Sequence, residues 1–399
     1  MRLGVLVPRY GREVVGGAEY LVRMLCEQLV SLRGWKVEVF TTGAVSAATW
    51  ADELSPGAAE LNGVTVHRHR SRSGRDPAYL ELLPLLADDP WHVPEDLARH
   101  FVELVGPVCP DAVDHAVASS CDLVAVTPYP FWPAVEAVPR LGRRAVFHPA
   151  AHDEPELHLP LMGDVFHAAG GFAYLSRAER TLVERTFGVG HRPQQVVGAA
   201  VEVGEGDTGP ARAALGLEPD EPFVLCLGRV ERNKGSHALA ELWRLYRSRR
   251  PDAPRLVVMG PVHEPLEPDG AVLVTGQQPE DVKWGALRAC TFLVNPSAWE
   301  SFSLVVPEAW LAGAPVLVNG RCHATVELCR LGRGGLWFSD YADFEVLVDR
   351  LLGDESLRSV LARRGLDYAR TELTWEAVTA RYGALVERIG GPQASEPAA

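Results

Sequence analysis

The amino-acid sequence predicts an α/β protein built from two doubly wound, parallel-sheet domains. Three observations support this prediction: short apolar runs alternate with amphipathic stretches, the alternating series occurs twice, and a glycine-rich polar segment separates the two series. Alternation of strands and helices is typical of parallel sheets that are covered by helices on both faces. The 399 residues suffice for two or three domains of about 150 residues each.

The first series contains apolar runs that we expect to form strands. They are residues 3–8, 37–41, 64–68, 123–127, 145–149, 171–175 and 195–197. Residues 18–31 follow the first run and carry Leu21, Leu25 and Leu29 at the spacing of one buried helix face. The first series therefore begins as a strand followed by a helix.

The second series follows residues 203–210, which are polar, glycine-rich and without periodicity, as in a linker. Its expected strands are residues 223–227, 255–259, 271–274, 292–295 and 315–318, and its expected helices are residues 236–248, residues 279–288 and one that ends at Leu311. We therefore predict one domain over residues 1–203 and a second over 204–374. An amphipathic helix is expected at 375–390, and residues 391–399 are expected to be disordered.

The composition of the chain argues against several classes of function. The net charge of −13 argues against a nucleic-acid-binding protein, which would need a basic face. No apolar run is long enough to span a membrane, and the seven scattered cysteines are typical of buried side chains in a reducing compartment. We expect a cytoplasmic protein without a zinc site. The basic residues 67–75 are expected to form a solvated loop, with contact to an anionic acceptor or a membrane surface as the alternative.

Paired glycines occur between the first strand and the first helix. Gly16 and Gly17 allow a bulky anion to approach the backbone, and the helix that begins there offers free N–H groups and the positive end of its dipole. A flexible turn before the helix explains the same residues. The pattern is not the GxGxxG fingerprint of a dinucleotide site.

A basic segment follows the first strand of the second series. Gly228 and Arg229 leave the strand, and Lys234 precedes the next helix. Two fixed cations at this place can neutralise charge on a departing diphosphate without a metal ion. A solvated basic loop is the alternative, but Lys234 is one of only three lysines in the chain.

The sharpest motif surrounds two glutamates at residues 296–310. Glu300 lies in a loop after a strand, and Glu308 lies early in the following helix, whose first turn tolerates a proline. The backbone N–H groups of Ser303 and Leu304 are expected to point at a phosphate. A carboxylate suits vicinal hydroxyls because it accepts two hydrogen bonds. The alternative places Glu308 at the helix dipole and Glu300 in solvent.

Histidines and carboxylates gather after the strand at residues 145–149. His148 or His152 is expected to donate to a sugar hydroxyl or to a developing charge. A structural turn is the alternative, and the spacing of His148, His152 and Asp153 matches no metal site that we know.

Together these motifs resemble the retaining glycosyltransferases of family 4, and the resemblance spans nearly the whole chain. It rests on Gly16-Gly17, on Gly228-Arg229 with Lys234-Gly235, and above all on Glu300 and Glu308 with seven residues between them. The resemblance implies the GT-B architecture, in which two Rossmann-like domains face each other across a cleft and the last helix, 375–390, packs back on the first domain. A looser resemblance is to a branch associated with bacterial surface glycans.

The resemblance also implies the roles of individual residues. The diphosphate of the donor is held by Gly16, Gly17, Arg229 and Lys234; Glu300 positions the transferred sugar, Glu308 holds the ribose, and the backbone at Gly276 and Gln277 meets the base. His152 lies near the reacting sugar, with His148 as the alternative, and the set that contacts the nucleotide also includes Gly228, Phe302, Ser303 and Leu304. Ser303 departs from the family, which often has glycine there, so the preferred donor stays open.

The implied activity is transfer of a sugar from a nucleotide-diphosphate donor to a hydroxyl acceptor, without a metal and with retention of the anomeric configuration. The acceptor is expected to be a glycan, a lipid-linked glycan or a small molecule, in polysaccharide, glycoconjugate or natural-product biosynthesis, and contact with the inner membrane face would suit a lipid-linked one. A non-catalytic nucleotide-sugar-binding subunit is the alternative from another class. An epimerase or phosphorylase of the same architecture is a third hypothesis.

Overall fold

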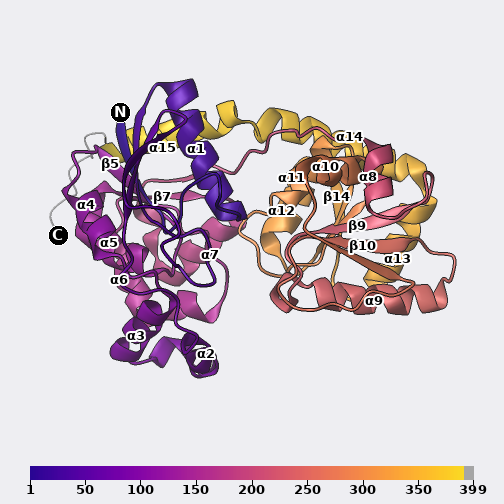
Figure 1. Ribbon diagram of the computed structural model, residues 1–399, viewed down its shortest axis with the longest axis horizontal. Coiled ribbons are helices and arrows are strands. Elements are labelled where there is room, and N and C mark those ends of the chain that lie inside the picture. Colours follow the sequence, from indigo (N-terminus) through magenta and orange to yellow (C-terminus); the bar gives the residue numbers. More distant parts are fainter. Residues whose placement is uncertain (391–399) are drawn as a thin grey trace. The chain divides into compact units, whose positions relative to one another are not determined.

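The computed structural model describes residues 1–390 and divides the chain into two compact units, which are described separately (Figure 1). The first unit comprises Met1–Gly198 together with helix α15 (Trp375–Gly390), and the second comprises Ala199–Thr374. The predicted domain boundary, residue 203, lies a few residues after Gly198. The predicted disordered tail at 391–399 lies outside the described residues.

The described residues of the first unit form an eight-stranded sheet with the order β3-β4-β2-β1-β5-β6-β7-β8. Its strands are β1 (Arg2–Leu6), β2 (Lys36–Thr42), β3 (Gly57–Leu61), β4 (Val64–His69), β5 (Leu123–Val126), β6 (Ala145–Phe147), β7 (Gly171–Tyr174) and β8 (Gln194–Val196). All neighbouring strands are parallel except β3 and β4. The predicted parallel sheet is therefore confirmed for this unit.

Strand β3 is absent from the sequence-based expectation. It pairs with β4 in an antiparallel hairpin, and the turn between them is Asn62-Gly63, both with positive φ (50° and 80°). Asn-Gly is the preferred dipeptide for such a two-residue turn, because its backbone twist matches that of the flanking strands. The signal for this strand was therefore present in the sequence.

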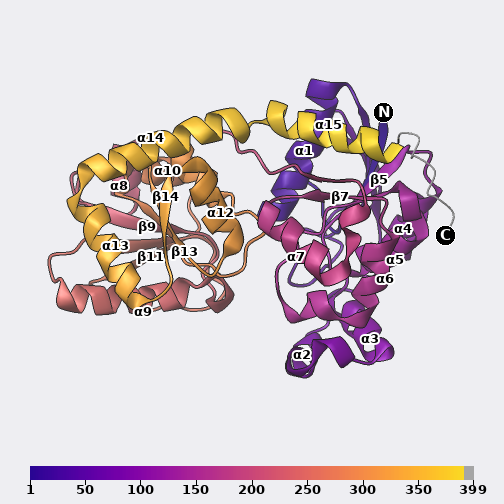
Figure 2. The same ribbon diagram turned by 180° about the vertical axis from the view of Figure 1, so that it is seen from behind.

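Helices cover both faces of the first sheet. They are α1 (Gly17–Arg33), α2 (Tyr79–Asp88), α3 (Glu95–Val105), α4 (Pro110–Ala118), α5 (Trp132–Leu141), α6 (Pro160–Ala168), α7 (Arg177–Phe187) and α15. Alternate residues of each strand point to opposite faces, so Val5 packs in the core with α1 and α15, whereas Leu6 packs in the core with α4, α5 and α6. Figures 1 and 2 show α15 running beside α1, with which it is in contact.

The described residues of the second unit form a six-stranded sheet, entirely parallel, with the order β11-β10-β9-β12-β13-β14. Its strands are β9 (Phe223–Leu227), β10 (Arg255–Met259), β11 (Val272–Gly276), β12 (Leu293–Asn295), β13 (Val316–Asn319) and β14 (Gly335–Phe338). The apolar runs of the sequence predict each of these strands except β14. The second parallel-sheet α/β domain is confirmed.

Two layers of helices enclose this second sheet. They are α8 (Thr208–Ala214), α9 (Ser236–Arg249), α10 (Glu280–Ala289), α11 (Val305–Leu311), α12 (His323–Gly332), α13 (Tyr341–Gly353) and α14 (Glu355–Glu372). Helices α9 and α13 share one core cluster with the strands. On the other face, Trp310 of α11 is fully buried, packs against Tyr368 of α14 and donates its indole N–H to the carbonyl of Gly334 (2.9 Å).

Two expectations about loops were wrong. The predicted linker at 203–210 belongs to the second unit: helix α8 begins at Thr208, and Arg288 donates to the carbonyl oxygens of Gly204 (2.6 Å) and Gly206 (2.7 Å). The basic residues 67–75 are not simply a solvated loop, because their first three residues end β4 and Arg75 is half-buried over the ring of Trp50. No helix among residues 1–390 combines the length and the apolarity needed to cross a bilayer.

Candidate functional site

Both sheets have a point at which the strand order changes direction, and the predicted motifs follow the strands at these points. In the first sheet this point lies between β1 and β5, and Gly16-Gly17 comes after β1. In the second sheet it lies between β9 and β12; the segment with Arg229 and Lys234 follows β9, and the segment with Glu300 follows β12. Open parallel sheets bind ligands beyond the carboxyl ends of strands at such points.

Lys234 and Glu300 form an ion pair that joins the two loops of the second unit. The ammonium nitrogen of Lys234 lies 3.0 Å from Oε1 of Glu300, and the two side chains are 27% and 18% exposed. The loops approach closely: Gly235 has a positive φ of 77°, and a Cβ there would lie 2.7 Å from the carbonyl oxygen of Pro296. Glycine is therefore required beside the ion pair.

Arg229 lies at the same strand end and is more accessible. Its guanidinium is 3.2 Å from Glu231, and half of the side chain is exposed. Gly228, directly before it, has a φ of 142°, and the neighbouring chain reaches it so closely that a Cβ on Gly260 would lie 2.0 Å from its carbonyl oxygen. Arg229 is thus an exposed cation on a tightly packed backbone.

Glu308 is partnered by a lysine that the sequence analysis missed. Lys283 of α10 donates to Glu308 of α11 (3.1 Å), and its ammonium group also lies 2.7 Å from the exposed Glu280. Burial raises the pKa of Glu308, and the positive charge of Lys283 opposes that rise. The second unit contains only two lysines, Lys234 and Lys283, and each binds one of the two motif glutamates. The rarity of lysine in the chain is the sequence feature that could have drawn attention to Lys283.

Ser303 has an unusual backbone. Its φ is +79°, in the left-handed region that disfavours side chains, and its hydroxyl accepts a hydrogen bond from the side-chain amide of Asn295 (2.7 Å). The carbonyl of the same amide accepts from the N–H of Ser297 (3.0 Å). Asn295 therefore holds both ends of the loop that carries Glu300, and Ser303 takes the conformation for which glycine is suited.

The remaining predicted residues of the second unit lie at strand ends or inside the core. Phe302 is buried (3% exposed), whereas Leu304 is half-buried just before α11. Gly276 ends β11 with a φ of 68°, and Gln277 after it is exposed. Gly276 and Gln277 thus form an accessible turn at the same edge of the sheet as the two ion pairs.

In the first unit, the paired glycines lie against an ion pair. Arg9 forms a short ion pair with Glu19 in the first turn of α1, and it also donates to the carbonyl of Val45 (2.6 Å). A Cβ on Gly16 would lie 2.2 Å from the Glu19 carboxylate and 3.2 Å from the Arg9 guanidinium. Gly16 is therefore needed for close packing, and Arg9 is a fixed cation beside it that the sequence patterns do not reveal.

The two candidate histidines have different surroundings. His148 is half-buried against α15, hydrogen-bonds the hydroxyl of Tyr382 (2.9 Å), and has its pKa lowered to about 4 by desolvation. His152 is 27% exposed, and its Nδ1 lies 3.7 Å from Glu154. His148 is thus engaged in packing against α15, whereas part of the His152 side chain is exposed.

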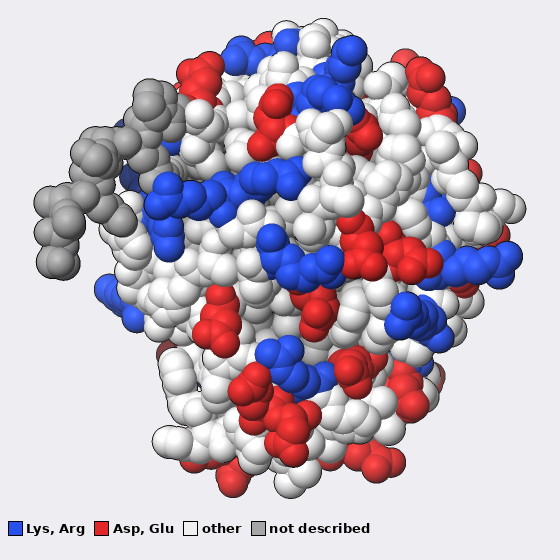
Figure 3. Space-filling view, turned by 90° about the vertical axis from the view of Figure 1, so that its left-hand side faces the viewer, with Lys and Arg blue, Asp and Glu red and all other residues white. Residues whose placement is uncertain are grey.

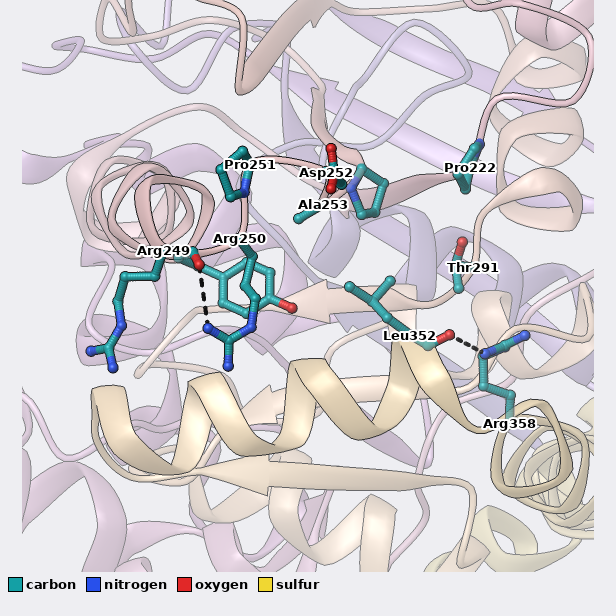
Figure 4. A pocket seen from close by; sticks show the side chains of 11 residues that line it. Pro222, Arg249, Arg250, Pro251, Asp252, Ala253, Thr291, Leu352 and Arg358 are labelled. Atoms are coloured by element: carbon teal, nitrogen blue, oxygen red, sulfur yellow. Dashed lines mark hydrogen bonds between the residues drawn. The ribbon is translucent and has the colours of Figure 1, made fainter.

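A cavity of about 490 Å³ lies elsewhere in the second unit (Figure 4). Its lining includes Pro222, Pro254 and Thr291, which precede β9, β10 and β12, so it opens at the amino ends of these strands, away from the predicted site. Arg249 and Arg250 line it, but they lie 3.1 Å from Glu345 and 3.0 Å from Asp349. We assign no ligand to this cavity because carboxylates balance these cations.

The surface charge is mixed. On the face shown in Figure 3, a short row of basic side chains lies among interspersed acidic and basic ones. Among residues 1–390, no cluster of three or more histidine, cysteine or acidic side chains has the arrangement of a metal site.

Comparison with known proteins gives a consistent result. The family model described as "Glycosyl transferases group 1" matches residues 221–354. The chain is 31% identical to the D-inositol 3-phosphate glycosyltransferase of Frankia alni, over 87% of this chain and 88% of that protein.

Two solved structures show the same fold. One is the sucrose-phosphate synthase of Thermosynechococcus elongatus, with a TM-score of 0.70, 20% identity, and coverage of 97% of this chain and 98% of that one. The other is Anabaena HepE in complex with UDP and glucose, with a TM-score of 0.67, 16% identity, and coverage of 97% and 99%.

Proposed function

The chain belongs to glycosyltransferase family 4, whose members have the GT-B architecture, and we propose that it transfers a sugar from a nucleoside diphosphate donor to a hydroxyl acceptor with retention of configuration. The observation that carries this proposal is the pairing of Lys234 with Glu300 at the strand ends where the order of the second sheet changes direction. The UDP and glucose in the HepE structure support a nucleotide-sugar donor.

The donor is held mainly by the second unit. Lys234 and Arg229 provide positive charge for the diphosphate, and Lys234 has two further N–H groups beyond the one that it gives to Glu300. Glu300 accepts from the hydroxyls of the transferred sugar, Glu308 accepts from the ribose hydroxyls, and Gly276 with Gln277 meets the base. Fixed cations can perform the task that a metal ion has in other transferases.

The first unit contributes the acceptor side. The start of α1 at Gly16 and Gly17, with its free N–H groups, is the part of this unit that we propose to contact the diphosphate. His152 is the accessible histidine and is proposed to donate a hydrogen bond at the reacting sugar.

The chemical step that we propose is the one implied by the resemblance to retaining glycosyltransferases. The bond between the anomeric carbon and the diphosphate oxygen breaks first, through an oxocarbenium-like transition state, and the acceptor oxygen bonds to the same face of that carbon. The proton of the acceptor hydroxyl passes to the departing phosphate oxygen. Lys234 and Arg229 stabilise the negative charge that grows on the leaving group.

A panel of nucleoside diphosphates identifies the donor base. UDP, GDP, ADP and dTDP are added in thermal-shift measurements, and the correct one at 100 times its dissociation constant stabilises the protein by about 2.7 kcal/mol. The corresponding glucose donor is then used with water or a hydroxyl acceptor, and proton NMR of the product gives the anomeric configuration. An inverted product contradicts the retaining mechanism, and donor binding without any turnover favours a non-catalytic binding subunit.

Lys234→Ala tests the role of the lysine in the chemical step. Its turnover is expected to fall by about 10²–10³-fold, as on losing one preorganised donor. Lys36→Ala is the matched control, because Lys36 is the exposed lysine of the first unit. Equal turnover of both variants contradicts the leaving-group role of Lys234.

A further inference from the structure

Glu179 is a buried carboxylate that none of the recognised motifs includes. It lies in the first turn of α7 and is 2% exposed. Its Oε1 accepts a hydrogen bond from the backbone N–H of Ala151 (2.9 Å), and its Oε2 accepts from the backbone N–H of Leu175 (2.7 Å). One side chain thus joins the end of β7 to the loop that follows β6.

The loop bound by Glu179 carries His152 and has an uncommon backbone. Ala150 has a φ of +53°, in the left-handed region, and a residue with a side chain stays there only when its surroundings hold it. The hydrogen bond to Glu179 is made by the next residue, Ala151. On the other side of the loop, the hydroxyl of Tyr129 donates to Glu154 (2.5 Å) and lies 3.4 Å from the carbonyl oxygen of His152.

We propose that Glu179 is a positioning residue that fixes the turn at residues 150–152 and thereby the imidazole of His152. This inference rests on the proposed role of His152 in sugar transfer. Glu179 itself does not touch the substrate; it determines where His152 stands.

The two acceptor positions explain why a carboxylate is needed. Both oxygens of Glu179 accept from N–H groups, which an ionised carboxyl can do and an amide cannot, because an amide replaces one acceptor by a donor. Burial raises the pKa of Glu179 to about 7, while the hydrogen bonds from Leu175 and Ala151 oppose that rise. His152 and Tyr174 are titratable side chains that interact with it.

A matched pair of variants separates the loop from the helix. Glu179→Gln removes one acceptor of the loop, whereas Ser176→Ala removes the hydroxyl that caps the same helix by accepting from the N–H of Glu179 (3.1 Å). Amide hydrogen exchange at pH 8 is followed by mass spectrometry. In Glu179→Gln, the amides of peptides covering residues 150–153 should exchange about tenfold faster than in the wild type. In Ser176→Ala, the same peptides should exchange at the wild-type rate.

Equal exchange of these peptides in Glu179→Gln and the wild type overturns the proposal. If Glu179→Gln fails to fold, Glu179→Asp takes its place, because the shorter carboxylate keeps its charge but does not reach both segments. Faster exchange at 150–153 in Glu179→Asp supports the proposal, and wild-type exchange overturns it.

Kinetics distinguish failure of this inference from failure of the proposed function. With the glucose donor found by the panel, Glu179→Gln should lower kcat by about 10–100-fold, the effect of a misplaced catalytic group. KM for the donor should stay unchanged, because the donor binds mainly to the second unit. If His152→Ala slows transfer but Glu179→Gln does not, Glu179 is not a positioning residue. If His152→Ala also leaves transfer unchanged, the proposed role of His152 fails, and with it the catalytic consequence of the inference.

Discussion

Lysine is the residue through which the second unit is most easily understood. The chain uses arginine for nearly all of its basic side chains, yet the two motif glutamates are both paired with lysines, Lys234 with Glu300 and Lys283 with Glu308. An ammonium group is a compact charge with three N–H donors on a flexible side chain. It can therefore donate to a carboxylate and to a phosphate or hydroxyl of a ligand at the same time. A planar guanidinium is suited to fixed, two-pronged contacts instead.

Lys283→Met tests how Glu308 is kept ionised. Without the neighbouring positive charge, burial is expected to raise the pKa of Glu308 further, so that more of it is protonated at pH 6 than at pH 8. A protonated carboxyl is a poorer acceptor for ribose hydroxyls. Nucleoside diphosphate affinity, measured by calorimetry at pH 6 and pH 8, is expected to fall, and to fall more at the lower pH. Lys36→Met is the control, and equal losses at both pH values would contradict this explanation.

The raised pKa of Glu179 predicts that the free energy of unfolding depends on pH. Its folded pKa of about 7 exceeds its ordinary value of 4.5, so the folded state retains the proton over this interval. The stability that this group contributes is therefore complete below pH 4.5 and is lost as the pH rises through 7, by at most about 3 kcal/mol. In urea denaturation, wild-type stability should fall relative to that of Glu179→Gln between pH 5 and pH 8. A constant difference between the two proteins refutes the raised pKa.

At the scale of an element, the loop between β12 and α11 combines strain with a compensating hydrogen bond. Ser303→Ala keeps the left-handed backbone but loses the bond to Asn295, and it should cost about 1 kcal/mol. Ser303→Gly loses the same bond but relieves the backbone, so its free energy of unfolding should stay closer to that of the wild type. Chemical denaturation of both variants measures the difference. The opposite order of stability would show that the backbone of Ser303 is not strained.

Helix α11, which carries Glu308, is held in place by α14. A Cβ on Gly365 of α14 would lie 2.4 Å from the ring of Trp310. Gly365→Ala should therefore overpack this contact, lower the free energy of unfolding by about 1–3 kcal/mol and weaken nucleotide binding. In the control variant, Gly353→Ala, the added methyl group meets no atom within 4 Å, so neither quantity should fall. An unaffected Gly365→Ala variant means that α11 and α14 are less tightly packed than the structure indicates.

Across the whole molecule, local patterns predicted most strands but not the contacts between distant segments. The two parallel sheets followed from apolar runs, because a strand buried on both faces has few alternatives. Strand β3 was missed although Asn62-Gly63 marks its turn. Strand β14 was also missed, and its pairing with β13 is visible only in the structure. The linker was misplaced because glycine also serves close packing, as at Gly204 and Gly206.

The candidate site could be predicted in part. Glu300, Glu308, Lys234 and Arg229 could be proposed from the sequence because their motifs are local. The partnership of Lys283 with Glu308 and the hold of Glu179 on Ala151 were not, because each joins residues more than twenty positions apart. Ser176 and Glu179 do form a capping-box spacing in the sequence, but that pattern predicts a helix start and says nothing of a second partner.

The central claim is that fixed cations, rather than a metal ion, hold the diphosphate of the donor. Calorimetric titration in EDTA of the best-binding member of UDP, GDP, ADP and dTDP, into wild type, Lys234→Ala and Lys36→Ala, tests it most directly. We predict binding to the wild type and to Lys36→Ala with equal affinity, and at least about tenfold weaker binding to Lys234→Ala. Binding that appears only when magnesium is added, or that is as strong in Lys234→Ala as in the wild type, contradicts the account.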